Sequence, residues 1–210
     1  MIYSEGNKYF LAPGIVLYKT SKEQAEAIKL NIEGTITCNN LWRPSKVVNL
    51  ETYKKELSLT RKCEDYRLDD PEFYGNNESL KNLSLSVHSW IDDKVKDYSL
   101  QHSVEETVKG PYILIKYQDS DKFDYHIDDG KTYPRTISMS AYLNDDYEGG
   151  EIEFPLFGIS HKPEAGDIIV FSSSFPYMHR VNPIISGTRY AIVNWYRYAG
   201  YPEEMKFGKA

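Results

Sequence analysis

The sequence is poor in cysteine, in long apolar runs and in surplus positive charge, and each shortage excludes a class of protein. Cys38 and Cys63 are its two cysteines, too few for a disulfide framework or a zinc–thiolate site, although the two could pair with each other. No apolar run approaches the roughly 20 residues that a membrane-spanning helix needs, and residues 1–10 lack the basic start and apolar core of a secretory signal. We therefore expect a cytoplasmic protein with no membrane partner.

The charge balance is acidic, because 25 Lys and Arg oppose 31 Asp and Glu for a formal net charge of −6. A protein that binds nucleic acid mainly by neutralising phosphates carries the opposite excess, so we do not expect nucleic acid as a partner. With 210 residues, 40% of them hydrophobic, the chain is long enough for one sizeable core. No Pro-, Ser- or Gly-rich linker divides it, and we expect a single domain over residues 1–210.

The first half of the chain reads as a helical supporting region. Apolar side chains recur at helical spacing in residues 21–32 and again from Glu78 onward. These positions are Ala25, Ile28 and Ile32 in the first helix and Leu80, Leu83, Val87, Ile91 and Val95 in the second. The residues placed to cap the helices are Thr20 or Ser21 and Asn76 or Asn77. Between them, residues 37–68 are polar and irregular, with a strand expected near residues 57–67, and nothing in this half reads as catalytic.

From Pro111 onward the sequence changes to short apolar strands separated by turns. In residues 135–144 apolar and polar side chains alternate, which is the period of a strand with one buried face. The apolar positions of that strand are Ile137, Met139, Ala141 and Leu143. Further strands are expected at residues 111–117, 151–157, 167–171 and 188–197. This spacing predicts a mainly β fold, a sandwich or jelly roll, behind a layer of helices.

The residues that carry chemistry gather in this second half. His126 and Asp128 stand at positions i and i+2, which point to the same side of a strand. An imidazole nitrogen and a carboxylate oxygen are two of the three ligands in the facial triad that holds non-haem Fe(II) with open coordination positions. The third ligand is another imidazole, and His179, just ahead of the last strand, is the best of the four remaining histidines.

The other histidines fit less well, and a plain alternative stays open. His88 and His102 belong to the helical half, and His161 follows a turn and reads as solvated. A lone His-X-Asp pattern arises often by chance, so Asp128 could belong to a solvated acidic loop and His179 could be an ordinary core histidine.

Arg189 stands ten residues after His179 in an otherwise apolar strand. It shares a face with Ala191, Val193 and Trp195. A buried guanidinium costs free energy unless an anion pairs with it, and its fork fits a carboxylate. The partner is either the carboxylate of a small ligand beside the metal or an internal Asp or Glu, which is the commoner use of a buried arginine.

Residues 117–197 resemble the prolyl 4-hydroxylase-like branch of the Fe(II)- and 2-oxoglutarate-dependent dioxygenases. The family pattern opens with Tyr, Gly, an aromatic residue, His and Asp, and the corresponding positions here are Tyr117, Ser120, Phe123, His126 and Asp128. The pattern continues here with Arg135, Tyr142-Leu-Asn, Gly149-Gly-Glu, Phe154-Pro and Pro163-X-X-Gly-Asp, and closes with His179, Arg189 and Trp195. The match extends in order over about 80 of the 210 residues.

The resemblance implies a double-stranded β-helix, a cupin-like jelly roll, as a catalytic core over residues 111–198 with residues 1–110 as its support. It implies an oxidoreductase that uses Fe(II), 2-oxoglutarate, O₂ and ascorbate to hydroxylate a C–H bond of peptidyl proline, with release of succinate and CO₂. The implied catalytic metal ligands are His126, Asp128 and His179. The implied 2-oxoglutarate-binding residues are Arg189, Tyr117, Tyr142 and Trp195, and Arg135 is implied to contact a proline-containing peptide or protein.

Four positions distinguish this chain within the family pattern. Arg189 stands where the collagen-type members carry Lys and the oxygen-sensing type carries Arg. Ser120 replaces the usual Gly, Phe123 replaces a Tyr and Ile152 replaces a frequent Thr. The last three fall on the substrate side, so another peptidyl residue or a free amino acid is an alternative substrate. A catalytically silent binding module and, last, a nucleic-acid demethylase are the alternative functions.

Two polar segments that contain Gly or Pro, residues 64–79 and 129–134, are expected to act as substrate lids.

Overall fold

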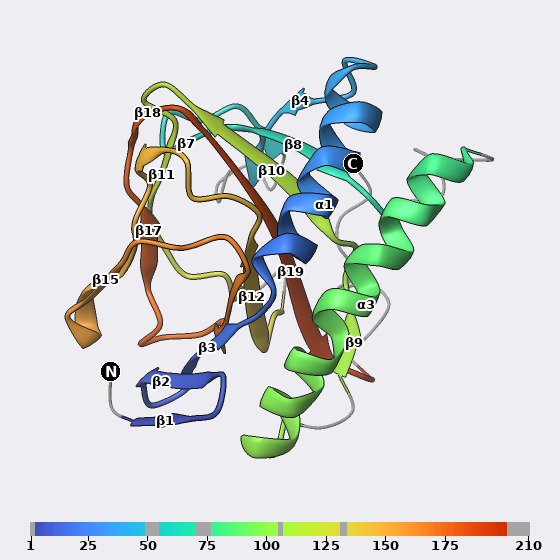
Figure 1. The fold of residues 1–210 in the computed structure, drawn as a ribbon. Coiled ribbons are helices and arrows are strands. Elements are labelled where there is room, and N and C mark those ends of the chain that lie inside the picture. The colour runs from blue at the N-terminus through green and yellow to red at the C-terminus, as the bar shows by residue number, and fades with distance from the viewer. Residues whose placement is uncertain (1–2, 49–54, 70–76, 105–106, 131–133, 201–210) are drawn as a thin grey trace.

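Two antiparallel β-sheets face each other, and two α-helices cover the outer side of the larger sheet (Figure 1). The computed structural model describes residues 3–48, 55–69, 77–104, 107–130 and 134–200. The larger sheet has ten strands and the smaller sheet has five. This arrangement confirms the predicted mainly β fold of jelly-roll type with supporting helices.

The strands of the larger sheet, in spatial order, are β1 (Tyr3–Glu5), β2 (Lys8–Ala12), β3 (Ile15–Lys19), β16 (Asp167–Ser172), β12 (Ile137–Tyr142), β19 (Thr188–Tyr198), β10 (Ile113–Gln118), β8 (Glu64–Arg67) and β4 (Arg43–Pro44), with β9 (Thr107–Lys109) also paired to β19. The strands of the smaller sheet are β15 (Ile159–His161), β14 (Ile152–Phe154), β17 (His179–Val181), β11 (Lys122–His126) and β7 (Arg61–Lys62). Two further pairs are β13 (Glu148–Gly149) with β18 (Ile184–Ser186) and β5 (Val47–Val48) with β6 (Lys55–Glu56). The helices are α1 (Lys22–Ile32), a π-helical turn (Glu33–Thr37), α3 (Glu78–Gln101) and a 3₁₀ turn (Pro155–Phe157).

Both helices begin where the sequence predicts. The Ser21 side chain caps α1 by accepting a hydrogen bond from the Gln24 N–H, and the Asn77 side chain caps α3 in the same way. The predicted apolar positions of both helices are buried in one core cluster with strands of the larger sheet. Neither these helices nor any other in the described part of the chain is long and apolar enough to span a bilayer.

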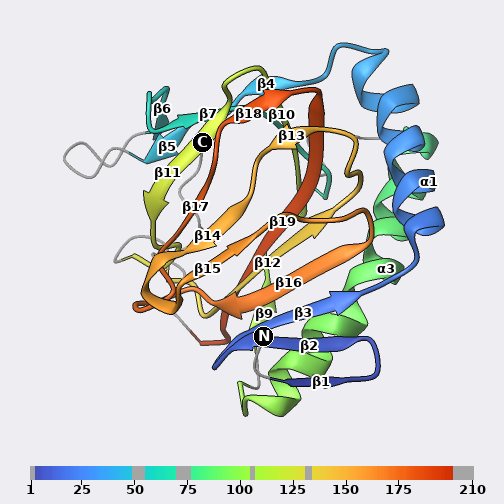
Figure 2. The same cartoon turned by 60° about the vertical axis from the view of Figure 1, so that its left-hand side comes forward.

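Strand β12 separates that core from the space between the sheets. Its apolar face, Ile137 to Leu143 at every second residue, packs in the core under the helices, as the alternation predicts. Ser138, Ser140 and Tyr142 on the other face line the space between the sheets. Figure 2 shows β19, β12, β16 and β3 side by side across the larger sheet, so the face opposite the helices is broad enough to form the floor of a site.

The polar stretch of residues 37–68 holds more regular structure than the sequence predicts. Strands β6, β7 and β8 replace the single strand expected near residues 57–67. Strand β8 pairs with β10, and β7 pairs with β11, so each is stabilised by a partner far along the chain. Strands stabilised in this way show little pattern in their own residues, so the sequence did not predict each of them.

The two expected lids are only partly described. Residues 64–67 form β8 within the larger sheet, so the expectation of a lid is wrong for them. Residues 70–76 of the first segment and 131–133 of the second lie outside the described residues.

Two expectations about single side chains are also decided by the structure. His161 is not simply solvated, because its Nε2 lies 2.9 Å from Oδ2 of the buried Asp167. Cys38 and Cys63 do not pair; Cys38 is exposed and Cys63 is buried, and both are free.

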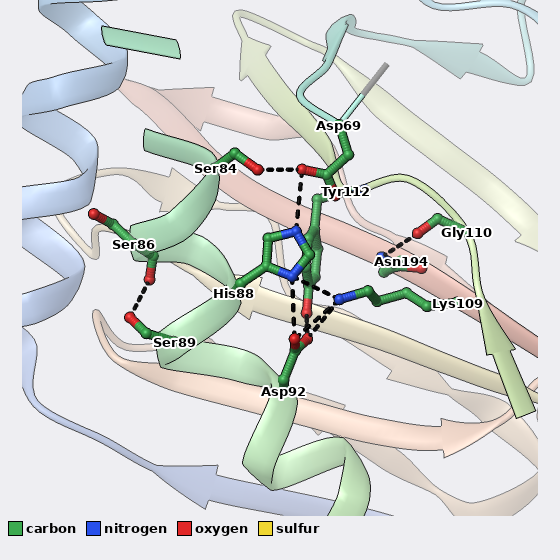
Figure 3. A network of polar contacts seen from close by, with 10 residues as sticks. All are labelled: Asp69, Ser84, Ser86, His88, Ser89, Asp92, Lys109, Gly110, Tyr112 and Asn194. Atoms are coloured by element: carbon green, nitrogen blue, oxygen red, sulfur yellow. Dashed lines mark hydrogen bonds and ion pairs between the residues drawn. The ribbon is translucent and has the colours of Figure 1, made fainter. Parts of the chain in front are cut away.

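A polar network fastens α3 to the strands beneath it (Figure 3). On α3, Asp92 accepts hydrogen bonds from Lys109 and from the Tyr112 hydroxyl. His88 lies between two carboxylates, 3.1 Å from Asp92 and 3.3 Å from Asp69. Burial raises the pKa of Asp92, but the hydrogen bonds from Tyr112, Lys109 and His88 outweigh it and the pKa is lowered overall. The folded state therefore favours the Asp92 carboxylate.

We expect Asp92→Asn to lower the free energy of unfolding at pH 7, and to lower it by less in acid. The folded pKa lies below the unfolded value of about 3.9, so the stabilisation is fully present above about pH 4 and is lost as the pH falls through the folded pKa. Urea unfolding at pH 7 and pH 3 measures both midpoints. Asp93→Asn, at an exposed carboxylate that pairs with Lys94, is the control. Equal midpoints for wild type and Asp92→Asn at pH 7 would contradict this prediction.

The turn between β10 and β11 is strained at Ser120. Its φ of +64° is in the left-handed region, which costs a residue with a Cβ about 1–2 kcal/mol. The Ser120 N–H donates a hydrogen bond to the Ile184 carbonyl at 2.9 Å, which holds the turn in this conformation.

Ser120→Gly should raise the free energy of unfolding by up to about 1 kcal/mol, because the relief of strain exceeds the entropy that glycine adds to the unfolded chain. Ser120→Ala keeps the Cβ and hence the strain, and should give no such gain. Chemical denaturation of both variants measures the difference. A glycine variant no more stable than the alanine variant would show that the turn is not strained.

Candidate active site

The three metal ligands predicted from the sequence meet at one point between the sheets. His126 ends β11, His179 begins β17, and the two residues are partners in the antiparallel ladder. Asp128 lies two residues beyond the end of β11, where its N–H donates to the Ser173 carbonyl. The ligand atoms of the three residues all lie within 4.8 Å of one another. The Asp128 oxygens are each 3.7 Å from a histidine Nε2, too far for hydrogen bonds and suited to a shared central ion.

Backbone carbonyls orient both imidazoles toward that centre. His126 Nδ1 lies 2.8 Å from the Asp124 carbonyl, and His179 Nδ1 lies 3.1 Å from the Tyr177 carbonyl. Because a carbonyl can only accept, each Nδ1 carries the proton and each Nε2 lone pair is left for the centre. Burial, followed by repulsion from His179, lowers the pKa of His126 to about 3. The imidazole is therefore neutral near pH 7, the form that binds a metal.

Asp128 is held as a carboxylate. Burial alone would raise its pKa, but His179, His126, Arg135 and a hydrogen bond from Ser138 lower it overall. The Ser138 hydroxyl donates to Oδ2 at 2.6 Å, and Arg135 Nη1 lies 3.5 Å from Oδ1. Two imidazoles and one carboxylate form the donor set of a non-haem Fe(II) site, with room left on the pocket side for further ligands.

Arg189 is buried in the same pocket, and no anion among the described residues pairs with it. It is 2% exposed, and its Nε and Nη1 have no hydrogen-bond partner among the described residues. The groups that act most strongly on its charge are the phenols of Tyr147, Tyr142 and Tyr117. Within the described part of the chain, the internal ion pair that the sequence left open is therefore absent.

Three tyrosines surround this guanidinium. The ring centroids of Tyr117 and Tyr142 lie 5.0 and 4.9 Å from its central carbon. Burial raises the pKa of Tyr142 to about 12 and raises that of Tyr147 too, so both hydroxyls keep their protons at neutral pH. Neither hydroxyl has a hydrogen-bond partner within the described residues. A carboxylate entering beside Tyr142 would accept hydrogen bonds from the guanidinium fork of Arg189 and from the phenol hydroxyl.

Trp195 and Arg135 adjoin the metal end of the pocket. The Arg135 guanidinium carbon lies 3.8 Å from the centroid of the Trp195 ring, a cation–π contact. Arg135 also donates to the Asp128 carbonyl, so it is tied to the loop that carries a metal ligand. Trp195 lines the pocket, and Arg135 stacks on it beside Asp128 without lining the pocket itself.

One pocket between the sheets contains nearly all of these side chains. Its walls come from β10, β12 and β19 of the larger sheet and from β11, β14 and β17 of the smaller one. The space between these walls, with the open solvent at its mouth included, is about 490 Å³. Apolar neighbours such as Ile115, Ile152 and Val181 complete the lining and limit water around the polar groups.

Two residues near the pocket were missed from the sequence. Tyr147 contacts Arg189 from outside the pocket wall, and Arg61 lines the pocket from β7. Tyr147 is one of 18 tyrosines and has no distinguishing pattern. Arg61 lies where the sequence predicts a strand, near residues 57–67, but no sequence signal predicted that this strand pairs with β11 and so brings Arg61 close to His126.

The comparisons with known proteins agree with this geometry. Residues 112–197 match the family model of the 2OG-Fe(II) oxygenase superfamily. A PKHD-type hydroxylase of Synechococcus sp. (strain CC9902) is 34% identical over 120 residues, which cover 54% of this chain and 53% of that protein. The chain thus spans about half the length of the curated relatives that it matches.

Solved structures show the same fold at low sequence identity. A Pseudomonas putida prolyl-4-hydroxylase has a TM-score of 0.66 and 18% identity, covering 89% of this chain and 94% of that one. A prolyl hydroxylase in complex with a hypoxia inducible factor oxygen degradation domain peptide fragment, from Trichoplax adhaerens, has a TM-score of 0.72 and 14% identity, covering 94% and 88%.

The family match, the fold and the His/Asp/His site lead to one class. The match to the 2OG-Fe(II) oxygenase superfamily covers residues 112–197, which include all three residues of the His/Asp/His site. The chain is also similar to PKHD-type hydroxylases in sequence and to prolyl hydroxylases in fold.

Removing one ligand should remove metal binding. We expect His126→Ala and Asp128→Ala each to weaken the binding of Fe(II), or of Co(II) as a stable substitute, by more than about tenfold, since even second-shell losses cost that much. His102→Ala, at the end of α3, should leave the affinity unchanged. Anaerobic calorimetry measures all three. A His126→Ala variant that keeps its affinity would show that the three residues do not share a metal.

Proposed function

We propose that the protein is an Fe(II)- and 2-oxoglutarate-dependent dioxygenase that hydroxylates a C–H bond, with succinate and CO₂ as co-products. One observation carries the proposal: a His/Asp/His site shares a pocket with a buried arginine that has no carboxylate partner in the described residues. A metal site alone fits many proteins. A metal beside an unpaired guanidinium fits a ligand that chelates with one end and carries a carboxylate at the other, which is the structure of 2-oxoglutarate.

In this proposal His126, Asp128 and His179 hold Fe(II), which with 2-oxoglutarate and O₂ supplies the oxidising chemistry. The Asp124 and Tyr177 carbonyls keep the two imidazoles in the tautomer that presents Nε2. Because the ligands stand at or beside the ends of paired strands, their geometry is set before any ligand binds.

The remaining pocket residues bind and orient. Arg189 pairs with the distal carboxylate of 2-oxoglutarate, and the neutral hydroxyl of Tyr142 donates a hydrogen bond to the same group. Tyr117 forms a wall of that subsite, and Trp195 forms a wall nearer the metal. Arg135, stacked on Trp195, contacts the substrate at the metal end.

A peptide or protein that contains proline is the proposed substrate. The support is the prolyl hydroxylase fold, including one structure that holds a peptide fragment, and the resemblance in the metal-binding motif. The proposal includes ascorbate as the reductant that keeps iron reduced, a cytoplasmic location, and one domain over residues 1–210 whose catalytic core is residues 111–198.

A binding module that keeps the pocket without turnover is the second candidate, because the same side chains would serve binding alone. A nucleic-acid demethylase is disfavoured by the formal net charge of −6. Succinate formation separates the binding module from the enzyme.

Turnover of 2-oxoglutarate to succinate by the purified protein with Fe(II), ascorbate and O₂ tests the proposal. We expect succinate from wild type and none from His126→Ala. Arg189→Met should raise the KM for 2-oxoglutarate at least about tenfold, because a charge-assisted bidentate contact is lost, and Arg189→Lys should recover part of it. Arg43→Met, at an exposed arginine, is the matched control.

Succinate formation that does not depend on His126, or a KM that Arg189→Met leaves unchanged, would contradict the proposal. A protein that binds Fe(II) and 2-oxoglutarate but forms no succinate with any peptide of a proline-containing panel would be the binding module instead.

A further inference from the structure

A second arginine reaches the metal pocket from the first half of the chain. Arg61 begins β7, at the edge of the smaller sheet, and pairs with Phe123 of β11. Its guanidinium carbon lies 5.0 Å from the centroid of the Phe123 ring. That ring stacks on the imidazole of His126, with centroids 3.6 Å apart. One aromatic ring thus separates the cation from a metal ligand.

Arg61 has no anionic partner in the described part of the chain. Its Nε is covered and makes no hydrogen bond. Its polar neighbours are the Cys63 thiol and Tyr117, while Asp65 acts on it from beyond ion-pair distance. Thiols and phenols are mostly neutral near pH 7, and burial raises the pKa of Tyr117 further. Among the described residues, Arg61 therefore has no carboxylate at ion-pair distance beside the pocket.

The carboxylates of 2-oxoglutarate do not account for this cation. Under the proposed function, one carboxylate binds the metal and the other pairs with Arg189, which contacts the Tyr117 ring from its own strand, β19. A third carboxylate would stabilise Arg61 by a charge-assisted contact. A neutral proline ring or an amide carbonyl would compensate less for the desolvation of a guanidinium.

We infer that Arg61 binds a carboxylate of the substrate that is hydroxylated, and hence that the protein acts on an acidic substrate. The inference rests on the proposed function and narrows its substrate class. The carboxylate belongs either to an acidic residue next to the target in a peptide or to the α-carboxylate of a free amino acid. Phe123 presents only a ring face to Arg61, so it supplies a surface for the cation and no competing acceptor.

Two matched pairs of probes test the inference and distinguish the sources. The first pair is the blocked peptide acetyl-Glu-Pro-Gly-amide and its Gln counterpart, and the second is L-proline and L-prolinamide. Calorimetry under anaerobic conditions measures their binding to protein loaded with Fe(II) and 2-oxoglutarate, where no turnover interferes. The variants are Arg61→Met, which removes the charge at similar length, and Arg61→Lys, which keeps it.

Lys62→Met is the matched control, because Lys62 is the next residue of β7 and its exposed side chain bonds the Asp119 carbonyl and Ser120 instead of lining the pocket. We expect wild type to bind the carboxylate member of one pair at least about tenfold more tightly than its amide. Arg61→Met should abolish that preference, Arg61→Lys should retain part of it, and Lys62→Met should leave it intact.

Wild type that binds the carboxylate members no more tightly than their amides overturns the inference, as does a preference that survives in Arg61→Met. A loss of 2-oxoglutarate affinity in Arg61→Met, with the preference unchanged, also overturns it and assigns Arg61 to the cosubstrate. Succinate formation that depends on His126 is scored separately, so the inference can fail while the proposed function stands.

Discussion

The rest of the structure depends on one constraint, a buried positive charge that has no counter-ion within the part of the chain that the structure describes. Removing a charged side chain from water costs several kcal/mol, and Arg189 recovers none of this from a carboxylate in the described residues. The fold tolerates the cost because β19 is paired with β10 on one side and β12 on the other, so its neighbours hold it in place. Under the proposed function, the pocket keeps this charge for an incoming anion at the expense of stability.

The metal site and this cation come from opposite sheets. His126 and His179 stand in the smaller sheet, whereas Arg189 stands in the larger one. A ligand that contacts both the metal site and Arg189 must be as long as the distance between them. The packing of the two sheets therefore determines which length of ligand fits. The helices contribute at a distance: α3 is fastened to the start of β10 through Asp92 and Tyr112, and this holds the larger sheet in place.

The sequence predicted what depends on local periodicity and on short spacings. Each of the two helices and strand β12 buries one face, so its apolar residues recur with the period of a helix or a strand and could be predicted. The His-X-Asp spacing correctly predicted that the side chains of His126 and Asp128 lie close together. Asp128 nevertheless lies beyond the end of β11 and not within it. Arg189 was detectable because a charged residue in an apolar strand is conspicuous. Arg61 and Tyr147 were not, because their positions beside the pocket depend on pairing and packing between distant segments.

The affinity for two oxo acids tests the central claim most directly. 2-Oxoglutarate and 2-oxopentanoate offer the metal the same chelating end, but 2-oxopentanoate lacks the distal carboxylate. Each is titrated anaerobically into the Fe(II)-loaded protein and followed by calorimetry. If Arg189 binds that carboxylate, 2-oxoglutarate binds at least about tenfold more tightly than 2-oxopentanoate, as expected for one charge-assisted bidentate contact. Equal affinities would contradict the account.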